Sequence, residues 1–219
     1  MADEVAAAVA GNFWIGSWLT IWYRPRATIR RIIDTDPTRF VLGIAWIAGA
    51  LGVLNSQMML STIDLPPKLP HLPRLGASGI AIAAFIIGVG NIVVLYCLAA
   101  LFRWSGQILG GSAQAIEVRA ALAWSQVPSL YLSVAMISAM VLGLYTPPAA
   151  HTASPLSLIE SIIGIWAFMI SLKCLGEVHR FSAWRALGAI MLGFFAVFAV
   201  VAGVVITIWL AVRVSHSLV

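Results

Sequence analysis

The sequence contains very little charge. Of its 219 residues only 10% are Asp, Glu, Lys or Arg, whereas 61% are hydrophobic. Soluble domains carry about a quarter charged residues, and a soluble chain of 23.4 kDa has no means of burying so much apolar surface. The scarcity of charge therefore excludes an ordinary soluble domain and indicates an integral membrane protein.

Cysteine is also scarce. Cys97 and Cys174 lie far apart in apolar stretches without a Cys-x-x-Cys pair, so we expect small core residues. No set of residues has metal-ligand spacing, and neither a metal nor a cofactor is predicted. The basic residues are scattered and form no aromatic and basic face, which argues against nucleic acid. The chain opens on two acids, Asp3 and Glu4, so we predict that no signal peptide is removed.

Five long apolar runs follow a polar start, each near the roughly 20 residues that cross a bilayer core. They lie at about 40–61, 78–102, 119–145, 156–175 and 187–212. The predicted fold is all-α, a polytopic bundle of five transmembrane helices with an N-terminal interfacial amphipathic helix. The chain divides into a cytoplasmic segment with interfacial helices (1–39), a membrane domain (40–212) and a short external tail (213–219).

The basic residues are distributed unequally between the two sides of this arrangement. Three lie on one side, and ten lie on the other: Arg24, Arg26, Arg30, Arg31, Arg39, Arg103, Arg119, Lys173, Arg180 and Arg185. Cationic loops stay in the cytoplasm. We therefore predict a multi-pass membrane protein with its N-terminus in the cytoplasm and its C-terminus outside.

An aromatic pattern marks the N-terminal segment. Trp14, Trp18 and Trp22 recur every four residues, which places them on one helical face. Indole rings favour the membrane interface, so the segment is predicted to lie there. The alternative is a span from Val5 to Tyr23.

A second short helix is predicted from Pro25, which suits a first helical turn. Ile29, Ile32 and Ile33 share one side, and Arg30 and Arg31 would face the lipid headgroups. The stretch from Arg24 to Arg39 would engage anionic headgroups.

Polar residues occur within the spans. Pro128 leaves the carbonyl of Trp124 without a donor and predicts a kink. An intramembrane cluster, either a gate or simple interhelical hydrogen bonding, is expected from Asn55, Gln57, Asn91, Ser125, Gln126 and Pro128. Small residues at 45, 49 and 52 and at 199 and 203 favour either packing within the bundle or a homo-oligomer.

Catalysis is not predicted. The stretch Gly76-Ala-Ser78-Gly79 resembles the Gly-x-Ser-Gly of rhomboid intramembrane proteases, a remote alternative, but every nearby histidine falls outside or at the end of a span. Glu160 is the only carboxylate within a predicted span and is expected at an interface. Glu177 and His179 are interpreted as a solvated loop pair.

Three stretches taken in order resemble the bacterial branch of the Yip domain family. They are Arg24–Asp34, Leu109-Gly-Gly111 leading to Ala123-Trp-Ser-Gln-Val-Pro128, and Leu175–Arg185. The resemblance covers about residues 14–210 and implies five spans in the bacterial cytoplasmic membrane with a cytoplasmic N-terminus. It also implies a shared surface formed by Pro25, Arg26, Arg30, Gly110, Gly111, Pro128, Glu177 and His179.

Eukaryotic members of that family act in vesicle trafficking and membrane shaping, but this chain lacks their long acidic domain and Tyr-Gly-Pro-type motif. The predicted function is a non-enzymatic protein that organises membrane lipid or recruits partners of unknown identity. The alternative is a carrier or scramblase that uses the kinked third span. The predicted lipid- or partner-binding residues are Trp14, Trp18, Trp22, Arg24, Pro25, Arg26, Arg30, Arg31, Gly110, Gly111, Glu177 and His179.

Overall fold

The computed structural model describes residues 14–60, 76–144 and 155–217. Every regular element in these ranges is a helix, which confirms the all-α class. Two short helices come first, residues 14–20 and α2 (Pro25–Thr35). They precede α3 (Val41–Leu60), α4 (Ala77–Ile108), α5 (Ala115–Trp124), α6 (Val127–Val141), α7 (Pro155–Val178) and α8 (Ala183–Ser217).

Four helical stretches within the described ranges are long and apolar enough to cross a membrane. They are Ala77–Ile108, Ala115–Val141, Leu158–Val178 and Ala183–Leu210. The first expected span coincides with α3, whose stretch Val41–Ser56 is a shorter apolar helix. Four of the five expected spans therefore have the required length, and the assignment of α3 as a fifth stays a prediction.

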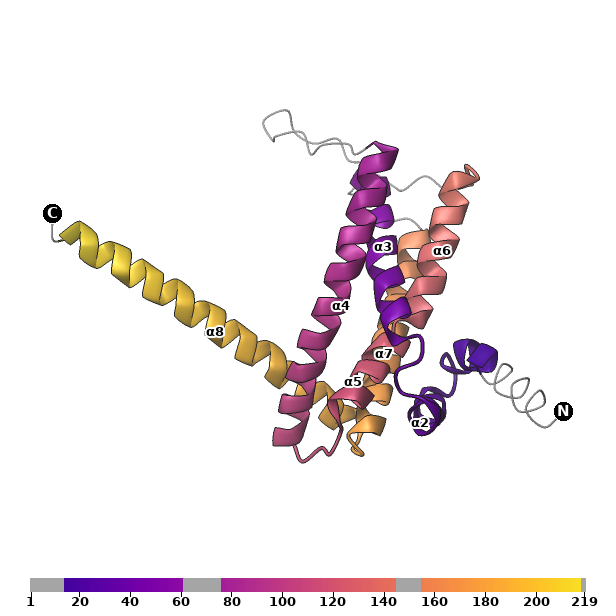
Figure 1. Ribbon diagram of the computed structural model, residues 1–219, viewed down its shortest axis with the longest axis horizontal. Coiled ribbons are helices and arrows are strands. Elements are labelled where there is room, and N and C mark those ends of the chain that lie inside the picture. Colours follow the sequence, from indigo (N-terminus) through magenta and orange to yellow (C-terminus); the bar gives the residue numbers. More distant parts are fainter. Residues whose placement is uncertain (1–13, 61–75, 145–154, 218–219) are drawn as a thin grey trace.

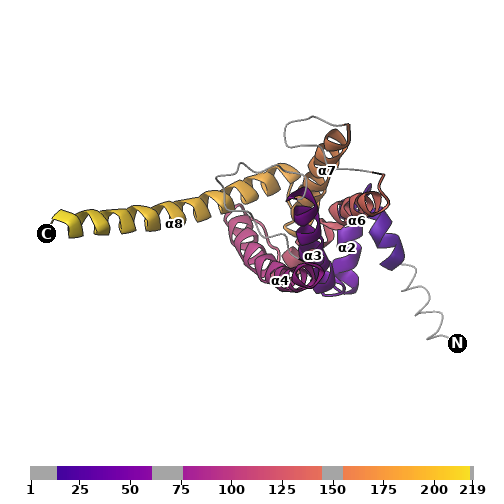
Figure 2. The same cartoon turned by 90° about the horizontal axis from the view of Figure 1, so that it is seen from above.

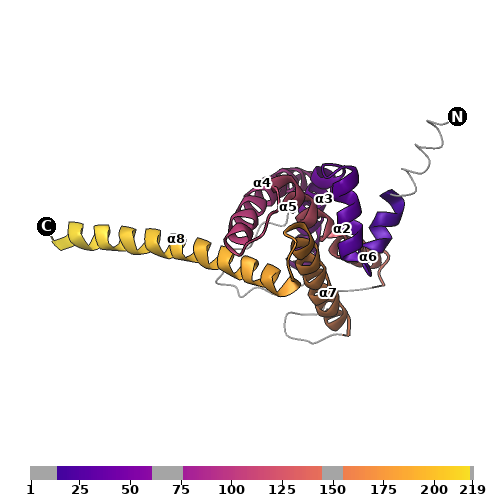
Figure 3. The ribbon, with the colours of Figure 1, turned by 90° about the horizontal axis from the view of Figure 1, so that it is seen from below.

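The helices form a bundle with its polar elements at one end. Figure 1 shows α3, α4, α6 and α7 side by side, with α2 and α5 at their lower end. α3 packs against α4 and α6, and α2 lies against α7 and α5, as the view from below in Figure 3 also shows. We call this the basic end, because the ten basic residues of the larger group counted above lie on α2 and α5, at the adjoining ends of α4, α7 and α8, or in the connections next to them.

Helix α8 leaves the bundle. Its first turns contact α4 and α7, and its second half extends away from them in both Figure 1 and Figure 2. Ile206 in this half is 56% exposed and Ile208 59%. A helix that is apolar on every side without protein neighbours suits a lipid environment.

The expected kink in the third apolar run is present. α5 ends at Trp124 and α6 begins at Val127, with Pro128 in its first turn. The Ser125 hydroxyl donates to the Leu122 carbonyl at 2.9 Å, whereas the backbone N–H of Gln126 donates to Ala123 at 3.0 Å. The Ser125 side chain thus satisfies a backbone carbonyl at the break, where a membrane interior supplies no water to do so.

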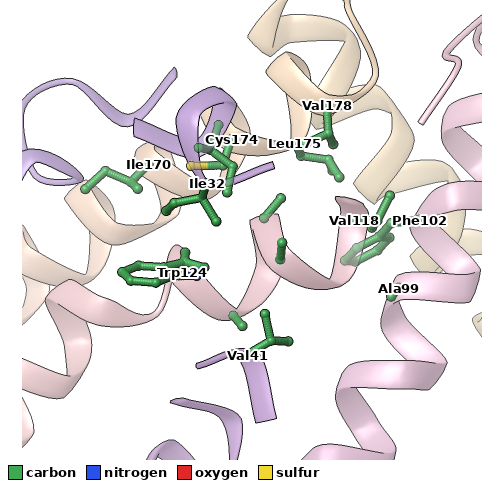
Figure 4. Packing of buried hydrophobic residues seen from close by; sticks show 14 of the residues in the cluster. Ile32, Val41, Ala99, Phe102, Val118, Trp124, Ile170, Cys174, Leu175 and Val178 are labelled. Atoms are coloured by element: carbon green, nitrogen blue, oxygen red, sulfur yellow. The ribbon is translucent and has the colours of Figure 1, made fainter. Parts of the chain in front are cut away.

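The hydrophobic core lies toward the basic end. Figure 4 shows Trp124, Ile32 and Leu175 converging from α5, α2 and α7. Cys174 is buried among them, as expected, but Cys97 is exposed on α4, unlike the core residue the sequence suggested. Because the core ties α2 to the bundle, it fixes the position of the arginines on that helix.

Candidate functional site

The tryptophans of the N-terminal segment point into the protein. Trp14 is only 4% exposed, and its ring stacks on Trp124 with centroids 6.2 Å apart. The ring centroid of Trp18 lies 5.3 Å from that of Trp124, and the ring of Trp22 contacts Tyr131. The periodicity identified the correct face, but protein covers this face, so the interpretation of Trp14 as a lipid-contacting residue is corrected. The alternative span from Val5 lies largely outside the described residues.

The opposite face of the same segment is open. Ile15, Leu19 and Tyr23 are each about two-thirds exposed, at 68%, 60% and 65%. Ile15 and Leu19 lie four residues apart on one face of the helix, and Tyr23 follows in the turn after it. We call these three residues the outer stripe, and they are the apolar surface of this segment that a membrane can reach.

Helix α2 is attached to α7 by an ion pair. Pro25 occupies its first turn, as expected, and Ile29 and Ile32 are fully buried beneath it. Arg30 Nε and Nη2 donate to Glu177 Oε1 at 3.1 and 3.0 Å. Arg30 Nη2 also donates to the Glu177 backbone carbonyl at 3.1 Å.

This pairing corrects the predicted role of Arg30, which does not face the headgroups. Arg26 Nη1 also approaches the same carboxylate, at 3.9 Å from Oε2 of Glu177. Arg31, in contrast, is exposed as expected. Four arginines that look equivalent in the sequence therefore differ in their contacts. Arg26 and Arg30 approach Glu177, whereas Arg24 and Arg31 do not.

His179 is not a solvated loop residue, which corrects a second interpretation. Its side chain is 1% exposed and stacks on Phe181 with ring centroids 5.0 Å apart. A Cβ atom added at Gly106 or Gly111 would collide with the imidazole. The two glycines thus form a cradle that holds His179, the residue that directly follows α7.

The environment of this imidazole favours its neutral form. Burial lowers the pKa of His179, with the Phe102 carbonyl and Glu117 opposing the effect. Neither ring nitrogen makes a hydrogen bond within the described parts of the chain.

Gly110, beside the cradle, has a φ of +83° that a glycine adopts without strain.

A pocket lies between the N-terminal segment and α2. It has a volume of about 240 Å³ and is lined on one side by Gly16, Ser17, Thr20, Tyr23 and Arg24, and on the other by Ala27, Thr28 and Arg31. A lining that combines two arginines with several hydroxyl-bearing side chains is suited to an anion. We call it the Arg24–Arg31 pocket.

The polar residues within the spans do not form one cluster. Asn55 Nδ2 donates to Ser133 Oγ at 3.0 Å, joining α3 to α6. Asn91 Nδ2 donates to the Ala45 carbonyl at 2.7 Å, joining α4 to α3. Gln126 is partly buried beside the break, and the side chain of Gln57 lies outside the described part. Of the two interpretations, this geometry corresponds to hydrogen bonding between helices.

Small residues occur in two settings. A Cβ atom at Gly49 would meet Asn91 and the backbone of α4 at 2.7–3.0 Å, so this glycine serves packing within the bundle. Gly203, by contrast, lies on the free half of α8 and has nothing within 4 Å.

Among the residues that the structure describes, no histidine lies near Ser78. Ser78 begins α4, whereas His179 packs against Gly106 near its other end, about 40 Å away at 1.5 Å per residue. Glu160 is exposed near the start of α7. Among the described residues no three His, Cys, Asp or Glu side chains come together as metal ligands.

Sequence reasoning missed three contributors to this end of the protein. Trp124 was not recognised as the partner of the tryptophan face, nor Gly106 as half of the histidine cradle. The hydroxyls of Thr20 and Thr28 were not associated with the arginines, although a repeat of hydroxyl residues next to Arg24 is a signal that a search could use.

Comparison with known proteins now adds to this geometry. The family model of the Yip1 domain matches residues 19–211, nearly the whole chain. No curated protein and no solved structure matches. The match includes α2, the glycine cradle and the end of α7, the stretches on which the resemblance was based. The chain belongs to the Yip1 domain family and is a multi-pass integral membrane protein.

Proposed function

We propose that this protein is a non-enzymatic organiser of membrane lipid, which holds anionic phospholipid at its basic end and presents that end to protein partners. The observation that supports this proposal is the arrangement of the N-terminal segment. The outer stripe exposes apolar side chains, and Arg24 and Arg31 stand beside it without a carboxylate partner in the structure as described. Apolar contact together with cationic side chains is how interfacial segments engage anionic bilayers.

The proposed orientation places the basic end in the cytoplasm of a bacterium. Ten of the thirteen Lys and Arg residues lie on α2, on α5, or on the helix ends and connections that adjoin them, and cationic flanks are retained on the cytoplasmic side. With α3 as the fifth span, the C-terminus lies outside. Each basic residue near an anionic surface contributes about 1 kcal/mol to its attraction.

The test is lipid selectivity. The full chain is reconstituted in vesicles of phosphatidylcholine with phosphatidylglycerol, and the fraction of each spin-labelled lipid that is immobilised by protein is measured. We expect preference for phosphatidylglycerol, reduced by Arg24→Gln with Arg31→Gln. Arg213→Gln, which removes an arginine that stacks on Trp209 outside the basic end, is the matched control.

Equal immobilisation of the two lipids by the wild-type chain would contradict the proposed function. Equal loss of preference in Arg213→Gln and in the double variant would show that any removed charge has the same effect, which also counts against a dedicated basic end.

A carrier or scramblase is the second candidate, because a groove lies between α3 and α4. It has a volume of about 520 Å³ and is lined by small and polar residues that include Gly49, Gly52, Ser56 and Asn91. The test is quenching of fluorescent phospholipid in the outer leaflet of vesicles. Flux that Gly52→Leu, which adds a side chain in this groove, abolishes would support this candidate, and no flux at any protein density would remove it.

A further inference from the structure

The two arginines of the Arg24–Arg31 pocket differ from their neighbours in what faces them. Arg26 and Arg30 approach Glu177. Arg24 and Arg31 make no ion pair within the ranges that the structure describes, and no acidic side chain lines their pocket. Within the described ranges, no acidic side chain therefore neutralises the two positive charges of the pocket, and we expect its ligand to carry negative charge.

Hydroxyl groups prepare the pocket for an oxygen-rich ligand. The Thr28 hydroxyl is buried and donates to Thr20 Oγ1 at 2.9 Å. Because the Thr20 oxygen accepts this bond, its own hydrogen is available for donation toward the pocket. Tyr23 adds a phenol at the opening. Donors of this kind around two guanidinium groups match the oxygens of a phosphate.

The outer stripe lies directly beside the pocket. At 100° per residue, Ile15 and Leu19 lie beside Gly16 and Thr20 around the helix of residues 14–20, and Tyr23 and Arg24 follow in the turn after it. Tyr23 belongs to both, since it lines the pocket and is 65% exposed. A ligand whose phosphate occupies the pocket would therefore lay an apolar tail along Ile15 and Leu19. A free phosphate or a phosphopeptide would leave that surface uncovered.

We propose that the Arg24–Arg31 pocket binds the phosphate headgroup of one anionic glycerophospholipid, with its acyl chains on the outer stripe. This inference rests on the proposed function and makes it specific, because it replaces a general attraction to anionic bilayer with one built site. Arg24 and Arg31 contact the phosphate, and Gly16 leaves the room that the headgroup fills.

Gly16 allows the pocket to be filled without loss of the fold. A Cβ atom at this position meets nothing within 4 Å, and replacing a helical glycine favours the helix. Gly16→Leu should therefore fold while its side chain occupies the site. Gly43→Leu is the matched control, because Gly43 also has nothing within 4 Å and lies away from the pocket.

The experiment is native mass spectrometry of the full chain, released from micelles supplied with phosphatidylglycerol. We expect one phosphatidylglycerol per chain in the wild type and in Gly43→Leu, and an affinity about tenfold lower in Gly16→Leu and in Arg24→Gln with Arg31→Gln. The same measurement is repeated with inorganic phosphate as competitor and with a phosphoserine peptide as alternative ligand.

Each outcome decides the proposal. Unchanged lipid binding in Gly16→Leu overturns it, and if the wild type still prefers anionic lipid in vesicles, the proposed function survives that result. Displacement of the lipid by millimolar inorganic phosphate, or tighter binding of the peptide than of the lipid, also overturns it in favour of a free-phosphate or peptide site. Absence of anionic preference in vesicles removes both proposals together.

Discussion

Arg30 and Glu177 join two segments that are far apart in the sequence through three hydrogen bonds. The residues lie on α2 and α7, and the guanidinium reaches both the carboxylate and the backbone carbonyl of Glu177, at 3.0–3.1 Å. This contact places α2 against the bundle, and therefore determines where the neighbouring Arg24 and Arg31 stand.

Breaking this pair should destabilise the protein. Because hydrogen bonds between charged groups are worth more than neutral ones but this pair is partly exposed, we expect Arg30→Gln to lower the free energy of unfolding by about 1–2 kcal/mol. Thermal unfolding of Arg30→Gln, Glu177→Gln and the double variant measures the coupling. Strictly additive effects would show that the two side chains do not act together.

The glycine cradle predicts a second effect. A methyl group at Gly111 collides with the His179 ring, so Gly111→Ala should cost about 1–3 kcal/mol of stability. Gly188→Ala, whose added Cβ meets only Leu109 at 3.5 Å, is the control and should be nearly neutral. Adding His179→Ala to Gly111→Ala should restore part of the loss, and a double variant as unstable as the sum of both would argue against the cradle.

His179 also predicts a dependence on pH. Burial lowers its pKa in the folded protein below the ordinary value of 6.5. As the pH falls through 6.5 the unfolded chain therefore gains a proton before the folded one, and stability decreases. The stability that depends on neutral His179 is fully present above this pH. Comparing unfolding temperatures at pH 7.5 and 5.5, we expect a smaller decrease in His179→Phe than in the wild type; an identical decrease would assign the effect to other groups.

The two faces of the N-terminal segment predict opposite results. Trp14→Ala removes a ring buried against Trp124 and should lower stability by about 3 kcal/mol. Leu19→Ala alters an exposed side chain and should change stability by less than about 0.5 kcal/mol while weakening contact with lipid. Thermal unfolding and proteolysis of the segment distinguish the two variants. If Trp14→Ala leaves stability unchanged, the interpretation that Trp14 faces lipid would be correct.

Much of the fold could be predicted because it follows local rules. The positions of the apolar helices follow from hydrophobic length, the start of α2 from Pro25, and the break before α6 from Pro128. The grouping of basic residues at one end follows from their order along a chain that crosses the bundle repeatedly.

The remaining features depend on contacts between distant segments. Nothing near Trp14 shows that Trp124 covers it, and nothing near Arg30 shows that Glu177 faces it. His179 is buried only because Gly106 and Gly111 on another part of the chain leave space for its ring. Periodicity gave the correct faces, but the identity of what lies against each face requires the assembled bundle.

The central claim is that residues 14–35 form the lipid-engaging element of this protein. Hydrogen exchange of the full chain in nanodiscs of pure phosphatidylcholine, and in nanodiscs that contain phosphatidylglycerol, tests it without any substitution. We predict that anionic lipid slows exchange in residues 14–35 and leaves α6 unchanged. Equal exchange of residues 14–35 in both lipids would contradict the account.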